Sequence, residues 1–211
     1  MPYFGAKPAD AAVNTLAHTT TIGDGTAADA LIKFDGNAQD FHIGLDDTAD
    51  DLVIGLGAAL GTTTHMSFDE AGIISMPLQA SASVNLSGNQ SISNATVTKI
   101  THDTEVYDIN GDFASNKFTC PVDGIYLMIG TVSMSLADAD NLTTYLFVNG
   151  SDVSRDSGSA AMTGNHNQST VLVKKLDASD YVEHYVYHTY GSSRDLTGSV
   201  QYTNFQVHKI A

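Results

Sequence analysis

The sequence predicts an all-β protein in two parts, a β-repeat stem followed by an antiparallel sandwich or jelly roll. Three observations predict it. An eleven-residue unit occurs three times in the first half, and strand-like apolar runs follow one another in the second half. Segments with helical periodicity are missing from the sequence, apart from one turn near residues 137–141.

The composition limits the functions to consider. Hydrophobic residues make up 42% of the 211 residues, which is enough for a packed core. The net charge of −15 argues against binding nucleic acid through its phosphates and against an anionic membrane surface. We interpret the aspartates mainly as a solvated surface. Calcium at Asp46, Asp47, Asp50 and Asp51 is the weaker alternative, and no other cofactor is predicted.

Residues 1–20 are predicted to be an attachment arm, with a disordered terminus as the alternative. The first fourteen residues show no signal-peptide pattern, and no stretch approaches the ~20 apolar residues needed to span a bilayer. Cys120 is the only cysteine, so no disulfide forms within one chain. Together these features favour a virion part, which leaves the cell by lysis.

Residues 21–80 are predicted to be the stem. The repeats begin at Asp29, Asp40 and Asp51, and each predicts one short strand and one tight turn. A looser copy follows, in which Met66 and Phe68 face inward. Such units cannot bury an apolar face alone and must stack on neighbours or on other chains. The fourth place of each repeat is therefore predicted to lie at a trimer interface: Ile32, Ile43 and Ile54.

Residues 81–96 are Ser/Asn-rich and uncharged, and are predicted to be a linker. The alternation of Val84, Leu86 and Ile92 leaves a last stem strand as the alternative. Residues 97–211 are predicted to be a knob, because several short strands follow one another there with polar turns between them.

The knob sequence resembles a known family. Its runs YDINGDF (107–113), FTCPVDGIYL (118–127) and YLFVNGSDVSR (145–155) are similar to the globular-head jelly roll of complement and tumour-necrosis-factor-like proteins. The resemblance implies a ten-strand sandwich that assembles as a tight homotrimer, with aromatic strands near the threefold axis. We therefore expect Tyr185 and Tyr187 at the trimer interface. The last strand departs from the family at Phe205-Gln206-Val207, where the family often has Phe-x-Gly.

The first half resembles structural proteins of marine tailed phages in the phrases FDGNAQDFHIGLDD (34–47) and DDLVIGLG (50–57). That resemblance covers about residues 21–75. It implies a stem carrying a knob, the arrangement of viral attachment fibres.

Candidate chemistry is sparse. His184 and His188 share one face of a predicted strand, where we expect half-buried histidines at a trimer interface rather than a metal site. Cys120 is expected to be inert packing, although His102 or His184 is a formal partner. No Gly-x-Ser-x-Gly elbow and no phosphate loop occurs in the sequence. We expect no enzymatic activity and no metal site.

Recognition is assigned to three polar segments predicted to be loops: 136–143, 154–168 and 189–198. The candidate receptor-binding residues in them are Arg155, Asn165, His166 and Arg194.

The hypothesis from sequence is a homotrimeric tail fibre or spike protein on the surface of a phage virion. It would bind another virion protein through the arm and a host-surface glycan or protein through the knob. A capsid decoration or head fibre protein with the same architecture is one alternative. A non-viral complement-head-like binding module and a glycan depolymerase, which would need a carboxylate pair, are the others.

Overall fold

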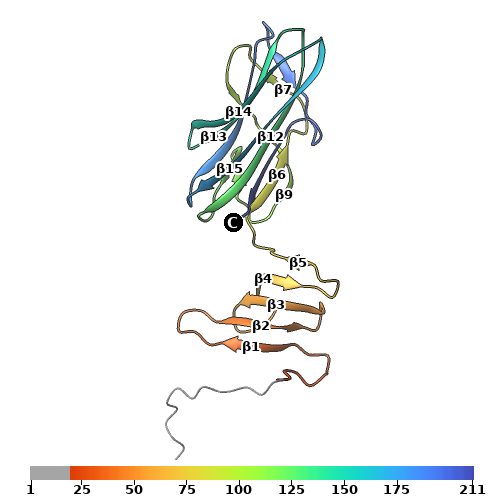
Figure 1. The fold of residues 1–211 in the computed structure, drawn as a ribbon, viewed down its shortest axis with the longest axis vertical. Helices are drawn as coiled ribbons and strands as arrows, with labels where there is room; N and C mark the ends of the chain where they lie inside the picture. Colours follow the sequence, from red (N-terminus) through yellow and green to blue (C-terminus); the bar gives the residue numbers. More distant parts are fainter. Residues whose placement is uncertain (1–19) are drawn as a thin grey trace, which may run out of the picture. The chain divides into compact units, whose positions relative to one another are not determined.

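The computed structural model describes residues 20–211, which fall into two units, one ending at Pro77 and one beginning at Leu78 (Figure 1). All regular elements of residues 20–211 are β-strands, and all strand pairs among them are antiparallel. This part of the chain contains no helix, and so none of the length and apolar character that would cross a membrane. The predicted attachment arm, apart from residue 20, lies outside the described residues.

The described residues of the first unit, 20–77, form a single five-stranded sheet, in which each strand pairs with the next along the chain. The three repeats supply its first three strands, so the prediction of one strand and one turn per repeat is confirmed. The strands in order are β1 (Ala30–Phe34), β2 (Phe41–Asp46), β3 (Asp51–Leu56), β4 (Thr63–Phe68) and β5 (Ile74–Ser75).

The eleven-residue step fixes the register of this sheet. Ile32 lies opposite Ile43, and Ile43 lies opposite Ile54. Met66 of the looser copy then lies opposite Ile54, after an irregularity in the pairing of β3 with β4. The same place in each repeat therefore lies in one row across the sheet.

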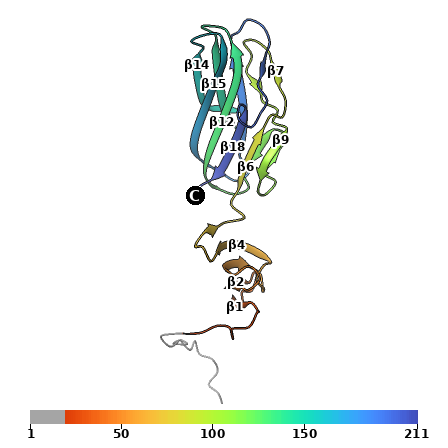
Figure 2. The ribbon, with the colours of Figure 1, turned by 90° about the vertical axis from the view of Figure 1, so that its right-hand side faces the viewer.

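The second unit is a sandwich of two sheets (Figure 2). The six-stranded sheet has β10 (Phe113–Ala114), β11 (Lys117–Thr119), β16 (Tyr181–His188), β13 (Asn141–Val148) and β14 (Ser151–Ser159) in that order, with β8 (Thr98–Lys99) also on β16. The seven-stranded sheet has β7 (Gln90–Ile92), β17 (Arg194–Leu196), β12 (Gly124–Leu136), β18 (Asn204–Lys209), β6 (Ser81–Asn85) and β9 (Thr104–Asp108) in that order, with β15 (Gly164–Leu176) also on β12.

The strand order is that of a jelly roll. The chain passes from β11 in the six-stranded sheet to β12 in the seven-stranded sheet and returns for β13 and β14. It then crosses to the seven-stranded sheet for β15, back for β16, and again to the seven-stranded sheet for β18. Inward-pointing side chains of both sheets form two buried clusters, one around Phe118, Tyr126 and Phe205 and one around Ile92, Met134 and Leu196. The prediction of an antiparallel sandwich is confirmed.

The predicted linker at 81–96 is wrong. This segment supplies β6 and β7 to the seven-stranded sheet. Ala82 and Val84 lie opposite Val207 and Phe205 and are buried, because every second residue of β6 points into the core. The Ser and Asn residues between them gave the segment the composition of a linker, yet the second unit already begins before β6.

His184 and His188 lie inside the sandwich, whereas the sequence analysis predicted them at a trimer interface. His184 is 1% exposed, and its Nδ1 lies 3.1 Å from Nε2 of His102, while its Nε2 lies 2.8 Å from the Thr144 hydroxyl. The ring packs over Gly130 of the facing sheet, where an added Cβ would lie 2.7 Å from Nε2. The interface prediction for His184 and His188 is therefore wrong: β16 turns its apolar positions and both histidines inward together.

Burial lowers the pKa of His102 from 6.5 to about 4 and also lowers the pKa of His184. In the unfolded chain both rings take up a proton near pH 6.5, whereas in the folded chain they resist it. We expect the free energy of unfolding to be highest above pH 6.5 and to fall as the pH drops toward 4, by about 3 kcal/mol from His102 alone. Urea unfolding at several pH values measures this.

His102→Gln should make that pH dependence shallower, and His166→Gln, on the edge strand β15, is the matched control. An unchanged slope in His102→Gln, or an equal change in both variants, would contradict the assignment.

Candidate association surface

One face of the repeat sheet is apolar along its whole width. The second, fourth and sixth places of each repeat point to this face, because alternate residues of a strand share a side. They align in three rows across the strands: Ala30, Leu45, Leu52 and Phe68; Ile32, Ile43, Ile54 and Met66; Phe34, Phe41 and Leu56. We call these rows the apolar face.

The apolar face is open to solvent in a single chain. Phe34 is 58% exposed and Ile32 is 44% exposed. Among the described residues of the first unit only one apolar side chain, Val53, is buried, and none belongs to either core cluster. The repeat unit therefore has almost no interior of its own, and its largest side chains remain uncovered.

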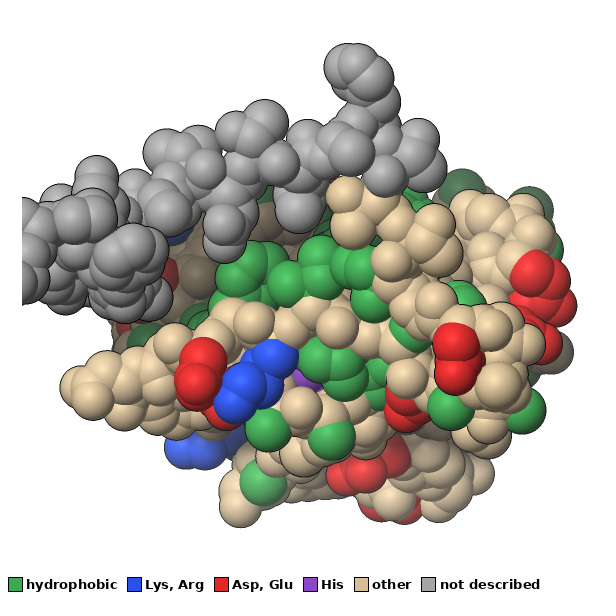
Figure 3. Space-filling view, turned by 90° about the horizontal axis from the view of Figure 1, so that it is seen from below, with side chains coloured by type: hydrophobic (Ala, Val, Ile, Leu, Met, Phe, Trp, Pro, Cys, Tyr) green, Lys and Arg blue, Asp and Glu red, His purple; other side chains and the backbone are tan. Residues whose placement is uncertain are grey.

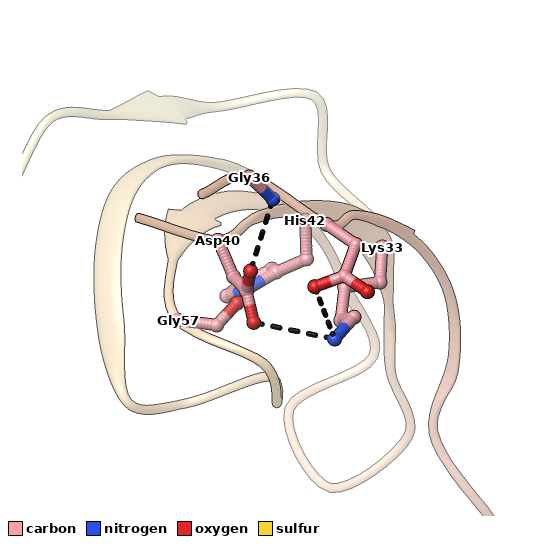
Figure 4. Close-up of polar contacts among 6 residues, drawn as sticks. Lys33, Gly36, Asp40, His42 and Gly57 are labelled. Atoms are coloured by element: carbon pink, nitrogen blue, oxygen red, sulfur yellow. Dashed lines mark hydrogen bonds and ion pairs between the residues drawn. The ribbon is translucent and has the colours of Figure 1, made fainter. Parts of the chain in front are cut away.

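The opposite face of the sheet is already closed. Leu31 packs over Gly44, where an added Cβ would lie 2.6 Å from the Leu31 Cβ. His42 packs over Gly55 in the same way, and its Nδ1 lies 3.0 Å from the carbonyl oxygen of Gly57 (Figure 4). The glycines at the fifth place of two repeats thus make room for the large third-place residue of the neighbouring strand, and this face needs no further partner.

The end of the apolar face at β1 is hollowed. A groove of about 230 Å³ is lined there by Ile22, Ala30, Leu31, Ile32, Ile43, Gly44, Leu45 and Leu52. Figure 3 shows hydrophobic side chains gathered at this end of the repeat unit. Side chains of another apolar surface can enter such a groove, whereas a polar ligand finds few hydrogen-bonding partners in it.

A polar cluster holds the turn between β1 and β2. Lys33 Nζ lies 3.2 Å from a carboxylate oxygen of both Asp35 and Asp40 (Figure 4). Asp40 also accepts a hydrogen bond from the Gly36 N–H at 3.1 Å. The hydrogen bond from Lys33 lowers the pKa of Asp40. The first Asp of the second repeat therefore stabilises the preceding turn.

A second group of aliphatic side chains, half-buried or exposed, lies on the outer side of the seven-stranded sheet. Leu127 and Ile129 of β12 lie opposite Val173 and Val171 of β15, and Ile125 extends the row. Val171 and Val173 are more than half exposed. We call these five residues the aliphatic stripe. Sequence reasoning missed it, although the run GIYLMIG, apolar at successive places, signals a strand covered on both faces.

The tyrosines expected at the trimer interface lie on the other sheet. Tyr185 and Tyr187 point outward from β16, as the alternation predicted. The Tyr185 ring packs on Phe147, with 4.3 Å between ring centroids, and its hydroxyl lies 3.4 Å from Glu183. The structure does not bring these tyrosines together with the aliphatic stripe, and their interface role stays a prediction.

Of the segments predicted to be recognition loops, 154–168 is mostly strand and belongs to β14 and β15. Segments 136–143 and 189–198 contain loops at 137–140, 189–193 and 197–198, and their other residues belong to β12, β13 and β17. The polar side chains on the outer sides of these strands gave them the composition of loops.

The candidate receptor residues divide into two places. Arg155 lies on β14, 3.8 Å from Asp152. Asn165 and His166 lie on β15, where Asn165 pairs with Ser135 and His166 Nε2 lies 2.7 Å from the Met162 carbonyl oxygen. Arg194 lies on β17 and lines a polar hollow that also contains Ser135.

Among the aspartates considered for calcium, Asp46 serves the turn after β2. Asp46 accepts hydrogen bonds from the N–H groups of Thr48 and Ala49 and so caps its own turn. Within residues 20–211, no three His, Cys, Asp or Glu side chains gather as they would around a metal ion.

No family model matches the chain, and no curated protein matches it. Solved structures similar to it include the Eiger TNF of S. frugiperda (11% identity, TM-score 0.49, 63% of this chain and 93% of that one). The globular domain of the zebrafish complement 1qA protein is similar at 20% identity (TM-score 0.47, 63% and 98%), and murine APRIL at 15% (TM-score 0.48, 62% and 99%). The jelly-roll assignment follows from the strand order alone.

Cys120 is 1% exposed, and burial raises the pKa of its thiol to about 12. At neutral pH the thiol is therefore protonated and shielded, which leaves it without nucleophilic character. We expect a thiol reagent at pH 7.5 to label the folded chain at least about 100-fold more slowly than the chain unfolded in guanidinium. Because the chain has one cysteine, the labelling rate reports this site alone. Equal rates in the two states would contradict the buried placement.

Proposed function

We propose that the chain is a homotrimeric structural protein of a virion surface appendage, a tail fibre or spike. The repeat unit serves as its stem and the jelly roll as a knob that recognises the host surface. The observation that carries the proposal is the apolar face, a wide set of aliphatic and aromatic side chains on a unit whose described residues form almost no interior.

The apolar face fits further copies of the same chain better than any other occupant. Its rows repeat at the strand spacing of about 4.8 Å, so an identical sheet offers matching ridges and grooves. Each side chain that becomes fully buried contributes about 1.5–3 kcal/mol. The charged cluster of Lys33, Asp35 and Asp40 lies at a turn, outside the rows, so contact between apolar faces leaves these charges in water.

Three copies are favoured by the sequence resemblance of the knob to trimeric heads. The aliphatic stripe gives the knob an apolar surface of its own. A ring with cyclic symmetry also closes on itself, so assembly stops at a defined number of chains.

The virion location is supported by the sequence resemblance of residues 21–75 to structural proteins of tailed phages. Stacked β-repeats carry a knob away from an anchoring point without needing a disulfide, and the chain has a single cysteine. The proposal includes no catalytic step. Microscopy of virions labelled with an antibody to the knob tests the location and separates tail from capsid.

Self-association is tested by sedimentation equilibrium. We expect the full chain to sediment at about 67 kDa, three times the 22.3 kDa of one chain. Ile43→Asp places a carboxylate in the middle row of each apolar face, which costs several kcal/mol per buried charge. This variant should dissociate at concentrations where the wild type is a trimer.

Ala58→Asp is the matched control, because Ala58 is exposed in the turn after β3 and lies outside the rows. It should leave the mass unchanged. Val171→Asp tests the aliphatic stripe separately. A wild-type chain that stays at 22.3 kDa, or an Ile43→Asp variant that associates as tightly as the control, would overturn the proposal.

A further inference from the structure

A polar hollow lies on the knob where β17 meets the ends of β7 and β12. Its volume is about 260 Å³, and its lining consists of polar residues: Asn89, Ser135, Ser193, Arg194, Asp195 and Thr197. Small-molecule pockets usually begin at about 300 Å³ and are mostly apolar. This hollow therefore suits one small, strongly hydrogen-bonding ligand rather than a large apolar one.

Arg194 is held in place by an aromatic ring. Its guanidinium carbon lies 3.5 Å from the centroid of the Tyr190 ring, the geometry of a cation–π contact. The backbone of Arg194 is fixed by pairing with Ile92 of β7. A side chain that is immobilised before binding loses little conformational freedom when a ligand arrives.

The charge of Arg194 is not neutralised within the described part of the chain. None of the ion pairs among residues 20–211 includes Arg194, although its sequence neighbour is Asp195. Its Nε is buried and has no hydrogen-bond acceptor. Lys117, Lys174 and Lys209 also have no ion pair in this part of the chain, but Arg194 is the only arginine among these cations. Its terminal N–H groups can therefore pair with an acceptor from outside.

The frame around the hollow is rigid. A Cβ on Gly198 would lie 2.1 Å from the carbonyl oxygen of Gly88, so the two segments touch through their backbones. The N–H of Gly198 also donates a hydrogen bond of 2.9 Å to Oδ1 of Asn89. These contacts join the β6–β7 connection to the segment after β17 and so fix one wall of the hollow.

We propose that this hollow binds a sugar unit that carries a carboxylate, as at an acidic position of a host-surface polysaccharide. The guanidinium of Arg194 pairs with the sugar carboxylate, because its parallel N–H groups match the two carboxylate oxygens. Asp195 accepts hydrogen bonds from ring hydroxyls, and Ser135 and Thr197 donate to or accept from them. A lining with one cation and one carboxylate among hydroxyls fits this ligand better than a simple anion, because a simple anion has no hydroxyl to donate a hydrogen bond to Asp195.

This inference rests on the proposed host-surface role of the knob and names the class of ligand that the knob would bind. Of the candidates from sequence, Arg194 lines the hollow, and Asn165 lies on β15 opposite Ser135 of the lining.

The test uses the full chain and saturation-transfer NMR with four probes. Glucuronate and N-acetylneuraminate carry both a carboxylate and hydroxyls, glucose carries only hydroxyls, and acetate carries only the carboxylate. We expect at least one acidic sugar to bind at least tenfold more tightly than glucose or acetate. Arg194→Gln should weaken that binding at least tenfold. Lys117→Gln is the matched control, because it removes another cation that lies over a tyrosine ring, and it should leave the binding unchanged.

The sedimentation mass of each variant is measured in the same samples, so a failure of assembly is distinguished from a failure of binding. A normal mass with no binding of either acidic sugar would overturn the sugar site and leave the trimer standing. Equal binding of glucose, or binding unaffected by Arg194→Gln, would also overturn it.

Discussion

The repeat sheet has one apolar face, and among residues 20–77 no second layer covers it. A half-buried sheet normally packs its apolar side on another sheet or on helices, but the described residues of the first unit contain only the single five-stranded sheet. Its other side is filled by large residues packed over Gly44 and Gly55, so the uncovered side is the only one available for contact. The stem, the trimer and the virion role proposed above all depend on what covers this face.

The second unit follows a different principle. Two antiparallel sheets bury their inward side chains against each other, and the interior contains uncharged histidines as well as aliphatic and aromatic groups. It has its own core, and the aliphatic stripe offers a place for another chain. The first unit therefore has an apolar surface that a single chain leaves uncovered, whereas the second unit is a sandwich around its own core.

Much of this architecture follows from simple sequence periods. The eleven-residue step placed Ile32, Ile43 and Ile54 in one row. Because one strand and one turn together span eleven residues in each repeat, the fourth residue of one repeat lies opposite the fourth residue of the next. The second place of the repeat, with Phe41 and Leu52, was missed because Ala30 occupies it in the first copy. Composition was the weaker guide. The Ser/Asn-rich segment 81–96 was predicted to be a linker, although it supplies two strands of the sandwich.

The binding residues were only partly predictable. Arg194 was named because arginine is rare in this chain. Its hollow depends on the pairing of β17 with β7 and on the contact between Gly88 and Gly198, more than a hundred residues apart in the sequence. His184 and His188 were placed on the correct side relative to the tyrosines. No local pattern indicated whether that side faced the core or a neighbouring chain.

Hydrogen exchange of the β2 and β3 amides, followed while the full chain is diluted, tests most directly whether other copies cover the apolar face. The account predicts strong protection when the chains are associated and a loss of protection that follows the fall in mass to 22.3 kDa. Full protection of these amides in a chain that is monomeric at every concentration would contradict it.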